Sequence, residues 1–153
     1  MIPRYATSIR EQARYSAATR DERIPVRFAG YAAVFNRVDR SGDVIRAGAF
    51  ASAREAVPLL WEHGGRVGLV ERVEEDGRGL RVIAAAERAV APGMGLSIGY
   101  RVRAARDLPR GRELLDLELI EVSLVRLPMQ PLARVIAVNS NPPRHGEVAA
   151  RQG

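Results

Sequence analysis

The sequence has 153 residues and a mass of 16.8 kDa, which is the size of a single domain. Hydrophobic residues make up 46% and charged residues 27%, a balance that is typical of a globular protein and excludes a disordered or collagen-like chain. No apolar stretch approaches the roughly 20 residues of a membrane span, and the first residues lack the apolar region of a secretory signal, so we expect no membrane association. The absence of cysteine excludes disulfides, thiolate metal sites and a cysteine nucleophile. With two histidines, we expect no metal and no cofactor.

The net charge is +6, from 24 arginines against 18 acidic residues, and the isoelectric point is near 10.8. Such a charge permits attraction to nucleic acid or to acidic protein segments. Residues 24–138, however, hold 17 arginines mixed with 14 acidic residues, which indicates a solvated surface and not a phosphate-binding stripe. Aromatic residues, which serve as stacking platforms for bases, make up 5% of the chain. We therefore expect no nucleic-acid binding.

The first half of the chain predicts an arm, a strand, a loop and a short helix. Residues 1–23 are rich in arginine and lack a sustained apolar period, so we expect a flexible basic arm. Alternating apolar residues open the segment 24–35, which predicts a strand that enters a core. A loop dense in Asn, Asp, Ser and Gly covers 36–48, and the alanine-rich segment 49–57 predicts a short helix that ends before Pro58.

The second half predicts a succession of strands. The dipeptide Asp76-Gly77 is a strong hairpin signal between two of them. The segment 129–138 predicts a last short helix or strand, and the Pro/Arg-rich tail 139–153 has little reason to fold. The expected strands here are 58–65, 66–73, 79–87, 96–104 and 113–127. We therefore predict one domain over 24–138, mostly β with two or three short helices.

Three polar residues stand where the strand patterns call for apolar ones. His63 follows Leu59 and Trp61 at strand spacing, which predicts that it shares their inward face. Ser97 lies in an alternating strand and faces away from its apolar neighbours. Glu121 interrupts the most apolar segment of the chain.

We expect Glu121 on the face that buries Leu117 and Leu119, where a carboxylate needs a hydrogen-bond donor or a cation. An imidazole N–H serves this purpose, and a hydroxyl, an imidazole and a buried acid are the parts of a nucleophilic Ser-His-acid site. The alternative is structural: a histidine at a strand end and a glutamate paired with an arginine are both common. The nucleophilic interpretation is favoured because all three residues break strand patterns in a chain with two histidines.

Other motifs are interpreted as structural. The string GLSIG matches the G-x-S-x-G nucleophile motif of α/β-hydrolases, with Asp116 and His145 following in the required order. We reject that assignment because the chain is too short for such a sheet and its covering helices, and His145 falls in the tail. The acidic group at residues 74–76 is interpreted as a hairpin tip, and Asp39 and Asp43 as turn formers, with a partner surface as the alternative.

Five motifs follow one another along residues 24–138: GYAAVFN, GDVIRAGAF, LLWEHGG, GLSIGYRV and ELLDLELIEVSLVRLPMQPLA. In this order they resemble the prohead (head-maturation) serine protease family of tailed phages. The family includes copies in prophages and in phage-like gene transfer particles. In fold it is similar to the herpesvirus assembly protease, so the resemblance implies a compact, β-barrel-like sheet with helices around it.

The resemblance also implies the roles of individual residues. The W-x-H motif gives His63 as the catalytic histidine and the S-x-G-[YF] motif gives Ser97 as the nucleophile. The acid of E-V-S-L-V is Glu121, with Glu62 and Ser123 as alternatives. Separately, we expect the oxyanion donors to come from the Arg101 side chain or from the backbone around Arg126.

The function implied is that of a serine endopeptidase that matures a capsid. Its expected partners are the major capsid protein precursor, whose scaffold-like segment it cleaves, a second copy of itself, and the procapsid shell with its portal. Its expected location is the assembling procapsid in the cytoplasm of a bacterial host. Relatives carry a longer, helix-forming insertion where this chain has only residues 85–95, so a second hypothesis is a catalytically inactive assembly module of the same fold.

Overall fold

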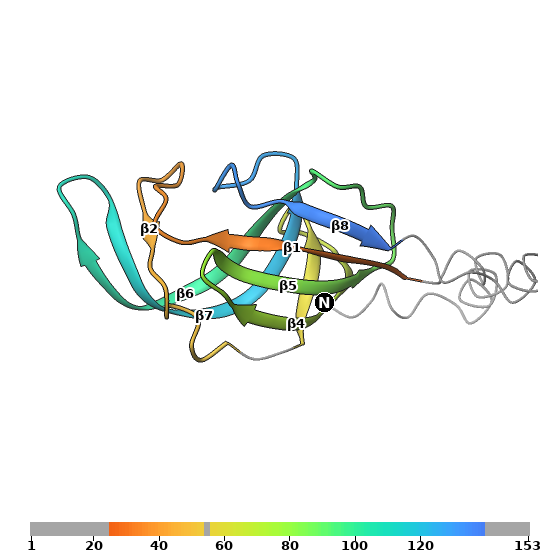
Figure 1. Ribbon diagram of the computed structural model, residues 1–153, viewed down its shortest axis with the longest axis horizontal. Helices are drawn as coiled ribbons and strands as arrows, with labels where there is room; N and C mark the ends of the chain where they lie inside the picture. The colour runs from red at the N-terminus through yellow and green to blue at the C-terminus, as the bar shows by residue number, and fades with distance from the viewer. Residues whose placement is uncertain (1–24, 54–55, 140–153) are drawn as a thin grey trace, which may run out of the picture.

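A computed structural model describes residues 25–53 and 56–139, which form a single eight-stranded sheet (Figure 1). The arm predicted at 1–23 and the tail predicted at 139–153 lie outside the described residues, except that Asn139 ends the last strand. The strands are β1 (Val26–Val34), β2 (Val44–Ile45), β3 (Val57–Trp61), β4 (Arg66–Glu75), β5 (Gly79–Ala86), β6 (Gly95–Asp107), β7 (Arg112–Val125) and β8 (Val135–Asn139).

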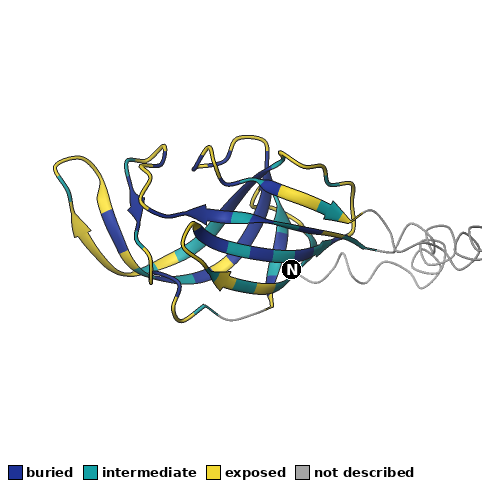
Figure 2. Cartoon of the chain, in the orientation of Figure 1, coloured by how far each residue is buried: buried dark blue, intermediate teal, exposed yellow. Residues whose placement is uncertain are grey.

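The strand order is β2-β7-β3-β4-β5-β1-β8, with β6 paired to the other edge of β7. Strand β7 is the organising element because it pairs antiparallel with β6 and parallel with both β2 and β3. The β6–β7 hairpin extends well beyond the rest of the sheet, at the left of Figure 1, and its tip is exposed in Figure 2. The inner ends of both strands, the start of β6 and the end of β7, are buried.

The mostly β prediction is confirmed, but the β-barrel-like arrangement is not. In the described residues, β8 and β6 share no continuous ladder and are joined by an isolated bridge between Gly95 and Arg134. The sheet is therefore open along this line. None of the described residues forms a helix that is long and apolar enough to cross a membrane.

The predicted short helices are wrong for the described residues, which contain no helix. Residues 47–52, expected to begin one, form consecutive turns with i to i+3 hydrogen bonds. The Glu75 carboxylate accepts the backbone N–H groups of Gly48 and Phe50, each at 2.7 Å, and Phe50 is buried. Tertiary contacts thus override the local helix propensity of the alanines. The last segment, left open between helix and strand, is strand β8.

The core lies on the buried faces of the strands, dark blue in Figure 2. Its fully buried members come from six different strands, and Phe35 stacks on Phe50 with ring centroids 6.4 Å apart. On β7 the pattern changes along the strand, because residues 121–125 are all buried whereas residues 112–120 include exposed positions. The largest buried aliphatic side chains are Leu59, Leu80, Leu96, Leu114, Leu117, Leu124, Val70, Val82 and Val122.

Candidate active site

His63 lies in a turn and not in a strand, contrary to the prediction. Strand β3 ends at Trp61, and the next two residues adopt left-handed backbone conformations, with φ of 50° at Glu62 and 58° at His63. Such angles are uncommon for residues with a side chain and need local support. The Glu62 N–H donates to Leu124 O at 2.9 Å, and the Gly64 N–H donates to Trp61 O at 2.8 Å. The turn therefore carries His63 off the inward face that Leu59 occupies.

The His63 side chain is paired with Glu121. Its Nδ1 lies 2.6 Å from Glu121 Oε1, and the other carboxylate oxygen accepts the Ser123 hydroxyl at 2.8 Å. An ionised carboxylate can only accept, so the proton of a neutral imidazole resides on Nδ1 and Nε2 keeps its lone pair. This is the tautomer that a general base in a serine hydrolase requires.

Ser123 connects the histidine turn to the acid. It is fully buried, its Oγ accepts the His63 backbone N–H at 3.1 Å, and it donates to Glu121. The other alternative acid, Glu62, turns away from the imidazole, because its Oε1 accepts the Arg126 backbone N–H at 2.9 Å. Among Glu121, Glu62 and Ser123, Glu121 is therefore the residue whose side chain contacts the imidazole.

A β-bulge decides the face on which Glu121 lies. Glu121 is opposite Gly99 in the β6–β7 ladder, but Leu119 is opposite Tyr100, so Ile120 is left over. Neighbouring residues of β6 point to opposite faces, and directly paired residues share a face. Glu121 and Leu119 thus lie on opposite faces, and the predicted shared face is wrong.

Ser97 shares the face of the acid. It is directly opposite Ser123 in the ladder and two residues from Gly99, so Ser97, Gly99, Glu121 and Ser123 all face the same way. A Cβ at Gly99 would lie 2.6 Å from Glu121 Oε1 and 2.9 Å from its Cγ. The glycine in the S-x-G motif therefore leaves the space that the Glu121 carboxylate fills.

Ser97 and His63 border the same cavity, of about 100 Å³. Ser97 is 8% exposed, whereas the His63 side chain is 46% exposed. In the part of the chain that the structure describes, no hydrogen bond joins these two side chains, and such bonds are often long before substrate binds. The residues that line the cavity are Ala32, Asp39, Ile45, His63, Leu96, Ser97, Ile98, Tyr100, Met129 and Gln130.

Tyr100 places a phenol at this cavity. Burial raises the pKa of Tyr100, and the negative charges of Asp39 and Asp43 raise it further, against a smaller opposing effect of Arg112. The hydroxyl therefore stays protonated at neutral pH. The strand pattern around Tyr100 gives no sign that this residue lines a cavity with Ser97.

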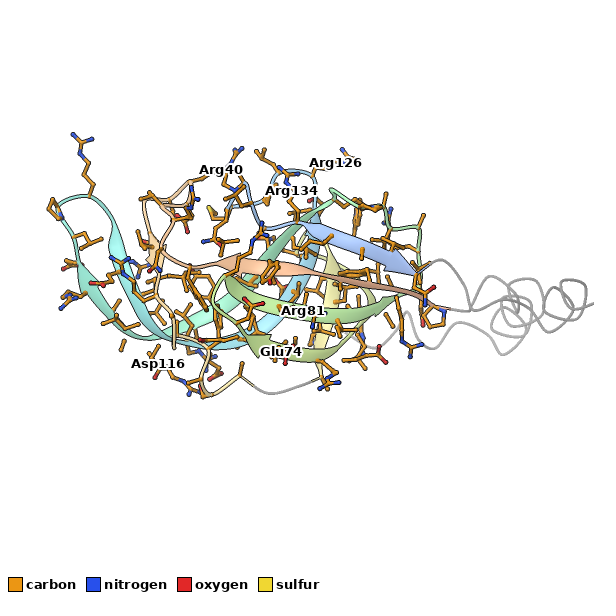
Figure 3. All side chains as sticks on the ribbon, in the orientation of Figure 1. Arg40, Glu74, Arg81, Asp116, Arg126 and Arg134 are labelled. Carbon is orange, nitrogen blue, oxygen red and sulfur yellow. The ribbon has the colours of Figure 1, made fainter. Side chains whose placement is uncertain are left out.

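Neither expected oxyanion residue borders the cavity. Arg101 has a side chain that is 73% exposed and lies 3.4 Å from Glu118. Arg126, in the loop after β7 (Figure 3), donates its backbone N–H to Glu62. The oxyanion assignment thus stays a prediction. The hydrogen bond from the Arg126 N–H to Glu62 holds the backbone of the loop after β7 next to the histidine turn.

Arg88, in the short segment before β6, contacts the residue that precedes the histidine turn. The Arg88 guanidinium lies over the Trp61 ring, 3.4 Å from its centroid, directly before Glu62 and His63. This cation–π contact is of the kind that fixes a loop against a strand end. Arg88, in the segment between β5 and β6, therefore contacts the last residue of β3, directly before the histidine turn.

Two further acidic residues, Asp76 and Asp43, have structural partners. Asp76 accepts the backbone N–H groups of Arg78 and Gly79 in the β4–β5 hairpin, and Asp43 pairs with Arg112 at 2.8 Å. Asp116, of the rejected hydrolase motif, lies on the outer part of β7 (Figure 3), and His145 falls outside the described residues. Within the described ranges, no group of three or more His, Asp or Glu is arranged to hold a metal ion.

We expect Gly99→Ala to displace the Glu121 carboxylate without touching Ser97. The added methyl group collides with that carboxylate and moves it away from His63, so if His63 acts as a general base for Ser97, kcat should fall about 100-fold. A matched control is Gly77→Ala, because a Cβ there meets nothing within 4 Å. Unchanged kcat in a folded Gly99→Ala variant would contradict this role of the glycine.

The fold belongs to a known class. The sheet is similar to that of KSHV protease, a herpesvirus enzyme solved in complex with a hexapeptide phosphonate inhibitor, with a TM-score of 0.54. That similarity covers 76% of this chain and 66% of the viral chain at 12% identity, so it shows the fold alone.

The sequence comparison then gives the family. Residues 12–145 match the caudovirus prohead serine protease family, and the chain belongs to it. The prohead protease of Enterobacteria phage HK97 is 31% identical in an alignment 137 positions long, which covers 74% of this chain and 60% of the HK97 protein. The chain thus spans about 60% of the length of this curated relative. The resemblance noted from the motifs is confirmed.

Proposed function

We propose that this protein is a serine endopeptidase in which Ser97 is the nucleophile, His63 the general base and then acid, and Glu121 the group that orients the histidine. The observation that carries the proposal is the 2.6 Å contact between His63 Nδ1 and Glu121 Oε1 beside a cavity that Ser97 and His63 share. Membership of the prohead serine protease family supports the same chemistry.

The reaction follows from this arrangement. His63 Nε2 takes the proton of Ser97 Oγ, which forms a bond to the carbonyl carbon of the peptide. The protonated imidazole, stabilised by the Glu121 carboxylate, gives the proton to the leaving nitrogen, and the C–N bond breaks. Water then loses a proton to Nε2 and attacks the acyl ester, and the returned proton restores Ser97. General-base help of this kind is worth about 10² to 10⁴ in rate.

The proposed substrates are the capsid protein precursor and the protease itself. This assignment is supported by the family and by the HK97 prohead protease, and it places the activity in the assembling procapsid. Residues 24–138 would form the protease domain. The basic segments 1–23 and 139–153 would serve as sites of self-processing or as contacts to the shell and its portal.

The alternative is a non-catalytic module that guides capsid subunits. Two observations favour it: Ser97 and His63 share no hydrogen bond within the described residues, and the Arg126 N–H is already taken by Glu62. Both arrangements can change when substrate binds, because catalytic contacts tighten in the complex.

Labelling of the full chain with an alkyl fluorophosphonate separates the two. An activated serine bonds to phosphorus and fluoride leaves, so the protease should gain one adduct, located on Ser97 by peptide mapping. Ser123 is an internal control, because it is fully buried and should stay unmodified. A folded chain that acquires no adduct at Ser97 would be the assembly module.

A further inference from the structure

The cavity beside Ser97 combines apolar walls with few polar groups. Half of its lining is aliphatic, from Ala32, Ile45, Leu96, Ile98 and Met129. Besides Ser97 and His63, the polar groups are Tyr100, Gln130 and Asp39. In such a cavity, the few polar groups that keep a free hydrogen-bonding atom determine which ligand is accepted.

The oxygen and the nitrogen of the Gln130 side chain are already engaged in hydrogen bonds. It is buried, its Oε1 accepts the Val34 N–H at 2.8 Å and its Nε2 donates to Val34 O at 2.8 Å. The amide thus extends the end of β1 in the manner of a strand neighbour. Tyr100 offers a neutral hydroxyl. Asp39 is therefore the group in the lining that can supply a negative charge.

In the described part of the chain, only one oxygen of the Asp39 carboxylate forms hydrogen bonds. Its Oδ1 accepts the Ser41 N–H at 2.8 Å, the Ser41 hydroxyl at 2.6 Å and the Asp43 N–H at 3.0 Å. Its Oδ2 accepts no hydrogen bond from the described residues, and none of their arginines forms a salt bridge with it. Asp43, four residues on, is by contrast neutralised by Arg112.

This carboxylate is also buried, since Asp39 is 7% exposed. Its charge reaches the Tyr100 hydroxyl, whose titration it affects, and both residues line the cavity. Among the described residues no fully enclosed side-chain oxygen lacks a hydrogen-bond partner, so Oδ2 is in contact with solvent, and a cation that enters the cavity can form a charge-assisted hydrogen bond with it. Serine proteases with a carboxylate in the pocket for the substrate side chain select basic residues for this reason.

We propose that this cavity receives the side chain of the residue whose carbonyl Ser97 attacks, and that Asp39 selects arginine or lysine there. The inference rests on the proposed function and adds the substrate class to it. A guanidinium pairs with Asp39 Oδ2 while its methylene stem lies along the aliphatic walls. The three hydrogen bonds that Oδ1 accepts keep the carboxylate in place.

The test compares two diphenyl phosphonates that differ in one side chain, a guanidinium-bearing analogue of arginine and its neutral counterpart, norleucine. Ser97 Oγ bonds to phosphorus, its proton passes to His63 and phenoxide leaves, so the rate of adduct formation by intact mass reports the occupant of the cavity. We expect the basic reagent to label the full chain about 100-fold faster, because a site built for a polar partner discriminates strongly.

Asp39→Asn should bring the ratio of the basic-reagent rate to the norleucine rate close to one, because the amide carries no charge. Its oxygen can still accept from the Ser41 and Asp43 N–H groups, so the loop should keep its fold. Asp43→Asn is the matched control: it removes the same charge next to the cavity but outside its lining, and it should keep the preference. Fluorophosphonate rates for each variant correct for altered folding.

Each outcome has one meaning. Equal rates for the two reagents in the unmodified chain, or a faster norleucine reagent, overturn the specificity while a fluorophosphonate adduct at Ser97 leaves the protease assignment standing. A preference that survives Asp39→Asn overturns the role of Asp39. A chain that no phosphorus reagent labels overturns the protease assignment and this inference together.

Discussion

Ser97→Ala is expected to leave a co-expressed capsid precursor at full length. Loss of the nucleophile in a serine protease lowers kcat by about 10⁶-fold, which removes processing on any practical timescale. The variant should fold normally, because no side-chain hydrogen bond of Ser97 exists among the described residues and the substitution leaves the β6–β7 ladder intact. The readout is the intact mass of the precursor after co-expression, with the thermal midpoint as a check on folding.

The matched control for this experiment is Ser52→Ala, which removes an exposed hydroxyl that contacts Arg103 and lies outside the lining of the Ser97 cavity. Its precursor should be processed as in the unmodified protein. Undiminished processing by Ser97→Ala itself would refute the nucleophile assignment and direct attention to another residue or to a host protease.

Glu121→Gln is expected to lower kcat by about 10⁴-fold with little change in KM, the loss seen when the acid of a triad becomes an amide. The carboxylate accepts two hydrogen bonds, from His63 Nδ1 and from Ser123 Oγ. An amide has one oxygen and one NH₂ group, so it cannot accept at both positions. If the NH₂ faces the imidazole, the proton of His63 moves to Nε2, which then cannot take the proton of Ser97.

The measurement is steady-state cleavage of a purified precursor, with fluorophosphonate labelling as a second readout that should fall in parallel. Glu71→Gln makes the same chemical change in an exposed pair with Arg27 and should behave as the unmodified protein. A Glu121→Gln enzyme within threefold of normal kcat would show that Glu121 is structural.

Local patterns were sufficient for most of the sheet. Alternating apolar residues predicted β1, β6 and β7, and Asp76-Gly77 predicted the β4–β5 hairpin, because strand periodicity and turn chemistry act over a few residues. The helix expected at 49–57 failed because Glu75, distant in sequence, accepts the N–H groups of Gly48 and Phe50. Contacts of that kind leave no trace in a local pattern.

The candidate site, like the fold, was only partly predictable from the sequence. The sequence alone was enough to single out His63, Ser97 and Glu121, because each is a polar residue in an apolar strand context, and motif order was enough to indicate the family. Their arrangement was not accessible, since a bulge at Ile120 depends on pairing with β6 and the turn at Glu62 and His63 depends on bonds to β7. Asp39 shows the same limit: its sequence context predicts a turn former, and it is one, but only the tertiary structure brings it to the cavity beside Ser97. Residue identity thus determined which chemistry was available to this protein, and the tertiary structure determined which groups meet, because strand register and long-range hydrogen bonds are properties of partners far apart in the chain.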